Sequence, residues 1–166
     1  MLHKKGFTLL EIVIVIGILL MLMTIIFSSV RIANDSLRAK THQEIYTQLL
    51  SASRRARDGA YNSDWGLYFS NDPITHEAES LTLYAGENYA TRDTQYDLVT
   101  EIDSSIIFSN ITLVDVNPFT GNGNEVTFEA FSGDPHQVGS MTLTTSTRQT
   151  IISIDSTGVP LITYVQ

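Results

Sequence analysis

Hydrophobic residues gather in one long run near the start of the chain, and later they alternate with polar ones. The run from Phe7 to Val30 has 24 residues and one charged residue, Glu11. As a helix it would extend about 36 Å, enough to cross a hydrocarbon core of about 30 Å. The preceding flank contains Lys4 and Lys5 and no acidic residue, so we expect it to stay in the cytoplasm. The sequence therefore predicts a single membrane-spanning helix with the rest of the chain outside the cytoplasm.

The next segment, 31–58, is more polar but keeps a helical pattern. One apolar stripe has the spacing i, i+4, i+7, i+11 and consists of Ile45, Leu49, Ala52 and Ala56. Three arginines, at 54, 55 and 57, fall in its last turn, where cations oppose the negative helix end, and Gly59 suits the position after it. We predict one helix from about Phe7 to Asp58, whose second half packs against a sheet. We interpret the arginines as helix-capping and solvated residues, with salt bridges to acidic surfaces of neighbouring subunits as the alternative.

Beyond Gly59 the period changes from about 3.6 residues to about 2. Segments rich in Thr, Ile, Val, Phe and Tyr are separated by turn residues, which predicts strands. The predicted strands are Trp65–Ser70, Leu81–Tyr84, Ile106–Val114, Glu125–Phe131, Ser140–Thr145, Thr150–Asp155 and Val159–Val165. Successive strands without helices between them indicate an α+β fold: a long N-terminal helix packed on an antiparallel β-sheet or small β-sandwich. The acidic segment 72–105 otherwise matches no known pattern.

Glu11 is the most informative residue of the apolar run. An acidic group in a bilayer costs on the order of 3 kcal/mol or more, so it marks a functional position. A secretory signal peptide would have a shorter apolar core and a small-residue cleavage site after it, and a generic membrane anchor would not explain the glutamate. Cleavage between Gly6 and Phe7 would create an α-amine four residues before Glu11, on the same helix face.

The segment from Lys4 to Ile12, Lys-Lys-Gly-Phe-Thr-Leu-Leu-Glu-Ile, resembles the prepilin signature of type IV pilins and type II secretion pseudopilins. The resemblance implies that prepilin peptidase cuts after Gly6 and that Phe7 becomes the N-methylated terminus. It also implies that Glu11 pairs with the terminal amine of a neighbouring subunit during assembly. The expected organisation is a leader at 1–6, a transmembrane and filament-core helix at 7–30, an amphipathic continuation at 31–58 and an exported β-rich domain at 59–166.

Two further features favour a minor subunit over a major one. Major pilins usually have a proline partway along this helix, and the run here contains none. In addition, three features are similar to the GspH/FimT type of minor pilins and pseudopilins. They are the Ala56-Arg57-Asp58-Gly59 stretch, the Trp65-Gly66 strand and a late hairpin with Gly158. The expected partners are prepilin peptidase, other pilin or pseudopilin subunits, an assembly platform membrane protein and the cytoplasmic membrane.

Charge is distributed very unevenly along the chain. Eight of its ten Lys and Arg residues lie at or before Arg57, and from Tyr61 onward 14 acidic residues face only Arg92 and Arg148. Such an acidic domain repels phosphate backbones, which argues against nucleic-acid binding. There is no cysteine, so disulfides and thiolate chemistry are excluded, and the exported domain must be stabilised by its core or by a bound ion.

Candidate chemistry in the domain is sparse. The four histidines, His3, His42, His76 and His136, have no zinc-type spacing. His3 lies in the leader and His42 on the helix, and we interpret the other two as solvated loop residues. An oxygen-rich segment keeps calcium open as an alternative, although its spacing does not fit an EF-hand loop; it comprises Asp115, Asn117, Asn122, Asn124 and Glu125. No nucleophile elbow and no phosphate-binding loop occur.

The sequence thus predicts a structural subunit and not an enzyme. We expect a minor type IV pilin or pseudopilin that enters a type IV pilus, a competence pilus or a type II secretion pseudopilus, and the sequence leaves the machine open. The alternative is a minor pilin whose exported domain is a binding module for DNA or a surface ligand.

Overall fold

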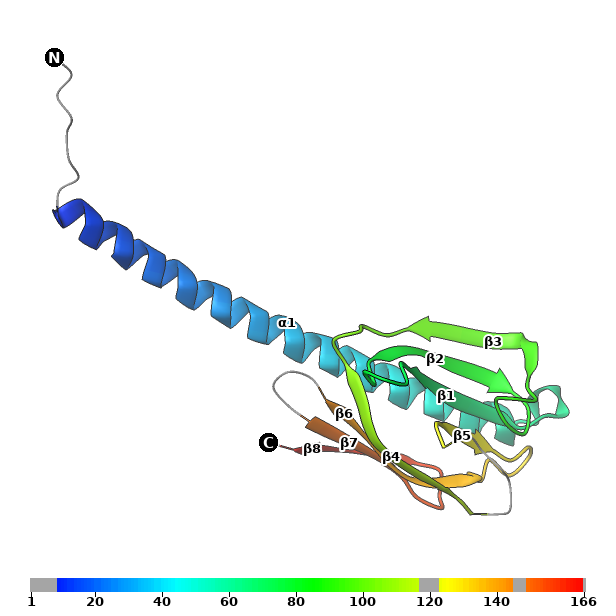
Figure 1. Ribbon diagram of the computed structural model, residues 1–166. Helices are drawn as coiled ribbons and strands as arrows, with labels where there is room; N and C mark the ends of the chain where they lie inside the picture. Colours follow the sequence, from blue (N-terminus) through cyan, green and yellow to red (C-terminus); the bar gives the residue numbers. More distant parts are fainter. Residues whose placement is uncertain (1–8, 117–122, 145–148, 166) are drawn as a thin grey trace. The chain divides into compact units, whose positions relative to one another are not determined.

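The computed structural model describes residues 9–116, 123–144 and 149–165. Its first element is the helix α1, Leu9–Arg57 (Figure 1). The chain divides into two compact units, Met1–Leu37 and Arg38–Gln166, so α1 contributes residues to both. The predicted start at Phe7 lies outside the described residues.

Helix α1 ends as its sequence predicts. The backbone N–H of Asp58 donates to Arg54 O (2.9 Å) and that of Gly59 donates to Ala56 O (2.9 Å). Gly59 then takes the left-handed conformation, with φ of 62°, which costs glycine little because it has no Cβ. A short 3-10 turn, η1, Ala60–Asn62, follows and leads into the first strand.

The second unit contains two antiparallel sheets (Figure 1). The first sheet has the order β3-β2-β1-β5 and the second has the order β4-β6-β7-β8. The strands are β1 Trp65–Asn71, β2 Ala78–Ala85, β3 Asp93–Glu101, β4 Ile107–Asp115, β5 Glu125–Phe128, β6 Gln137–Thr144, β7 Gln149–Ile154 and β8 Pro160–Val165. The predicted α+β class, with a helix and antiparallel sheets, is therefore confirmed.

The C-terminal part of α1 lies against both sheets. All four residues of the predicted stripe are fully buried, Ile45, Leu49, Ala52 and Ala56, which confirms the stripe. They join one core cluster with buried residues of both sheets, such as Trp65 and Leu143. This burial supplies most of the favourable free energy, at about 25 cal/mol per Å² of apolar surface removed from water.

Seven of the strands overlap the predicted segments, although β2 and β6 each begin three residues before the predicted start. Two larger differences concern β5 and β3. The predicted strand Glu125–Phe131 ends at Phe128, because Phe131 takes a positive φ of 69° and its N–H donates to Ala56 O (2.8 Å). Strand β3 was not predicted. It is an edge strand with mostly exposed or half-buried residues, so it lacks the alternating apolar pattern, and its pairing with β2 defines it.

Candidate functional site

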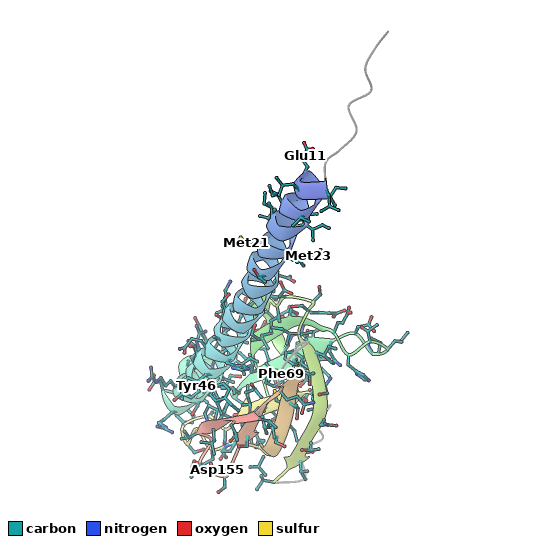
Figure 2. The ribbon with its side chains drawn as sticks, turned by 90° about the vertical axis from the view of Figure 1, so that its left-hand side faces the viewer. Glu11, Met21, Met23, Tyr46, Phe69 and Asp155 are labelled. Carbon is teal, nitrogen blue, oxygen red and sulfur yellow. The ribbon has the colours of Figure 1, made fainter. Side chains whose placement is uncertain are left out.

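Glu11 lies in the first turn of α1, and its side chain is exposed (Figure 2). Gly6 and Phe7, the predicted cleavage and methylation positions, lie outside the described residues. Glu11 is therefore the one member of the predicted processing and assembly set that the structure places.

In the first unit, the part of α1 around Glu11 has an exposed apolar surface. From Leu9 to Thr24 every described side chain is exposed, and the large apolar ones are 50–82% exposed. Contiguous apolar surfaces of this kind mark membrane or protein interaction sites, because exposure to water is unfavourable. Within the described part of the chain, no helix reaches the combined length and hydropathy expected of a membrane span.

The last turn of α1 shows what the arginine cluster contacts. The Arg55 guanidinium lies 4.6 Å from the centroid of the Trp65 ring, a cation–π contact with a fully buried indole. Arg54 and Arg57 are exposed. Arg92, one of the two basic residues after Arg57, is neutralised by Asp97 at 2.9 Å and stacks 3.6 Å from the Tyr89 ring centroid. Arg148 lies outside the described residues.

His136 is buried, contrary to the prediction that it is a solvated loop residue. His136 is 5% exposed, and its Nε2 lies 3.3 Å from Asp64 Oδ2, because the segment after β5 folds back on the core. His42, on α1, is also buried, at 2% exposure, with its ring 5.8 Å from that of Tyr164. His76 is exposed as predicted. No group of three metal-ligating residues forms within the described ranges.

In the oxygen-rich segment considered for calcium, the described side chains make hydrogen bonds to different protein groups. Asp115 Oδ1 accepts from Gln137 Nε2 (3.1 Å), and Asn124 Nδ2 donates to Asn71 Oδ1 (2.9 Å). Glu125 Oε2 accepts from the Tyr84 hydroxyl and the Tyr89 N–H. Asn117 and Asn122 lie outside the described residues. The described members of the set are thus directed to different partners.

The Glu125 carboxyl is the centre of a buried polar network that the sequence did not reveal. Glu125 is fully buried, and its Oε2 lies 2.8 Å from the Tyr84 hydroxyl and 2.6 Å from the Tyr89 nitrogen. The Tyr84 hydroxyl also lies 2.7 Å from Thr127 Oγ1. Burial, and secondarily the charge of Glu125, raises the pKa of Tyr84 well above its usual value, so the phenol keeps its proton. The network holds the 86–92 connection against β5.

Comparison with known proteins bears on the N-terminal segment. Residues 1–27 match a family model described as the prokaryotic N-terminal methylation motif. No curated protein and no solved structure gives a significant match to the chain. The motif supports a type IV pilin-like protein that is processed as a subunit. It implies processing by a prepilin peptidase, membrane anchoring and assembly with other pilins.

Proposed function

We propose that this protein is a minor pilin or pseudopilin, a structural subunit with no catalytic step of its own. Prepilin peptidase cuts between Gly6 and Phe7, and the new Phe7 terminus is N-methylated. The subunit then leaves the membrane for a filament with the help of an assembly platform membrane protein. The methylation motif at residues 1–27 is the observation that carries this proposal.

The exposed helix surface around Glu11 supports the assembly step. In a filament, neighbouring helices would cover the apolar side chains that α1 leaves exposed between Leu9 and Thr24. Glu11 is the single charge in that run, so pairing with the Phe7 amine of a neighbour would compensate it and fix the register of the two helices. Before assembly the same surface would face lipid, in a single-pass topology with the C-terminal unit outside the cytoplasm.

The minor subtype rests on the helix and the domain together. Helix α1 has no proline from Leu9 to Arg57, and it leads through Gly59 into the Trp65 strand, as in the GspH/FimT type. The competence pilus, the type IV pilus and the type II secretion pseudopilus are all compatible with these features.

Replacing Glu11 tests the assembly role. We expect Glu11→Ala subunits to be cleaved normally but to be strongly depleted from sheared filaments, because the buried amine loses its counter-charge. Intact mass and immunoblots of membrane and filament fractions measure both steps. Glu44→Ala is the matched control, since Glu44 lies on the same helix outside the apolar run.

The pairing of Glu11 and the cleavage by prepilin peptidase are tested separately. Wild-type amounts of Glu11→Ala in filaments would contradict the pairing. A Gly6→Asp precursor that still loses its leader and gives the normal mature mass would contradict the peptidase assignment.

A further inference from the structure

A cavity of about 580 Å³ lies in the second unit, between the end of β1 in one sheet and β4 in the other. Its volume is in the range of about 300–1,000 Å³ that is typical of small-molecule sites. Tyr68 and Phe108 provide aromatic walls, and Pro73 and Ile111 add apolar surface. Five polar residues complete the lining, Asn71, His76, Ser109, Asn110 and Asn124. None of these residues belongs to the segment used for processing and assembly.

Both strands that form the cavity depart from regular pairing where they line it. The register of β1 with β2 shifts between Ser70 and Asn71, and that of β4 with β6 shifts between Ser109 and Thr112. Such bulges redirect side chains and are common next to binding sites. Gly139 makes the β4 irregularity possible, because a Cβ on it would overlap the backbone carbonyl of Thr112.

Two of the polar lining residues also have strained backbones. Asn110 has a φ of 48° and His76 has a φ of 59°, in the left-handed region that costs non-glycine residues free energy. The turn before His76 is held rigidly, since Asp72 Oδ1 accepts from the N–H groups of Ile74 (2.7 Å) and Thr75 (2.8 Å). The Phe108 N–H donates to His76 O (3.0 Å) and ties this turn to the β4 wall. The lining is thus set in place before any ligand arrives.

The chemistry of the lining selects a neutral, hydroxyl-rich ligand. The cavity is lined by no Lys, Arg, Asp or Glu among the described residues, so a charged ligand would lose its hydration without compensation. Carboxamides both donate and accept hydrogen bonds, as sugar hydroxyls do. Asn124 donates to Asn71 (2.9 Å), and Asn71 Nδ2 lies 3.4 Å from His76 Nδ1, which orients this row and leaves further donors and acceptors for a ligand.

Tyr68 completes the site with an ordered aromatic ring and a hydroxyl donor. Its ring stacks on that of Tyr89 with centroids 3.7 Å apart and planes 6° apart, which fixes its orientation. Burial, followed by the effect of Tyr89, raises the pKa of the Tyr68 phenol, so it remains protonated at neutral pH. An apolar wall beside rows of amides suits the mixed surface of a sugar ring.

We propose that this cavity is a saccharide-binding site, formed by the Asn71, Asn110 and Asn124 carboxamides against the Tyr68 and Phe108 rings. It gives the exported unit a ligand-binding role in addition to filament assembly, and it does not depend on the processing of the N-terminus.

Titration of sugars against the full chain tests the site. The protein is kept in micelles of a detergent without a sugar headgroup, and glucose, galactose and N-acetylglucosamine are each followed by saturation-transfer NMR. Asn110→Gly removes one carboxamide, and glycine accepts the positive φ, so the variant should fold. Asn62→Gly is the matched control, because Asn62 is also exposed, has a φ of 55° and does not line the cavity.

We expect saturable binding of at least one of these sugars. Without the hydrogen bonds that the Asn110 carboxamide would make to the sugar, Asn110→Gly should bind it about 3- to 10-fold more weakly, and Asn62→Gly should keep the wild-type affinity. Absence of saturable binding by the wild-type chain overturns the proposal, and so does equal affinity in Asn110→Gly and wild type. Asn110→Gly should still enter filaments, so a failure here is distinct from a failure of the Glu11 experiment.

Discussion

Replacing Tyr84 by Phe removes one hydroxyl from the buried network around Glu125 and keeps the aromatic ring. The lost contacts are the 2.8 Å hydrogen bond to Glu125 Oε2 and the 2.7 Å hydrogen bond with Thr127 Oγ1. Each buried polar group that loses its partner costs about 1–3 kcal/mol. The Tyr89 N–H still donates to Glu125, so the carboxyl stays hydrogen-bonded. We therefore expect Tyr84→Phe to lower the free energy of unfolding by about 2–3 kcal/mol.

Urea titration with tryptophan fluorescence measures this change directly. Trp65 is the single tryptophan of the chain and is fully buried, so its emission reports unfolding of the second unit. With a urea dependence of about 1–3 kcal/mol per M, the midpoint should fall by about 1–2 M.

The matched control is Tyr61→Phe, since Tyr61 is 65% exposed and its ring stacks on Tyr96. A Glu125→Gln variant and the double variant complete a cycle that should show coupling of about 0.5–3 kcal/mol between Tyr84 and Glu125. An unchanged midpoint in Tyr84→Phe, or additive effects in the cycle, would refute the reasoning that this network stabilises the fold.

Two other predictions use the same fluorescence assay. Gly66→Ala should destabilise by about 1–3 kcal/mol, because its Cβ would overlap the buried Tyr84 ring; a midpoint at the wild-type value would contradict this packing. The Thr157 hydroxyl and N–H donate to Asp155 Oδ1 and hold the pKa of that carboxyl below its usual value. The ionised carboxyl therefore adds to stability above the unfolded pKa of about 3.9, and this addition is lost as pH falls through the lower folded pKa. The stability of Asp155→Asn should therefore fall less steeply than that of the wild type below about pH 4. Identical pH profiles of the two proteins would contradict this prediction.

The helix, its end and most of the strands could be predicted, because each depends on a pattern of residues close together in the sequence. The apolar stripe from Ile45 to Ala56 follows helical spacing, and Gly59 is the residue type that best tolerates the left-handed turn after a helix. The strands with alternating or continuous apolar residues were also predicted, with ends that differ by a few residues. By contrast, β3 is an acidic edge strand, and only pairing with β2 identifies it.

The candidate sites divide in the same way. The processing motif is contiguous, so the sequence alone predicts roles for Gly6, Phe7 and Glu11, and a family model matches residues 1–27. The cavity residues come from positions far apart in the chain, such as Tyr68, Asn110 and Asn124. Asparagines in turn-rich segments are common, so their residue types alone gave no signal for a site.

The sequence by itself determined that this chain carries a prepilin-type N-terminal motif, a long helix and an antiparallel β domain, because the motif, the helical spacing and the strand alternation are each patterns of neighbouring residues. The tertiary structure decided which polar groups meet. It buried Glu125 beside Tyr84 and His136 beside Asp64, and it brought three asparagines to the lining of one cavity. These contacts depend on the register of strands in two sheets, which follows from how the whole core packs.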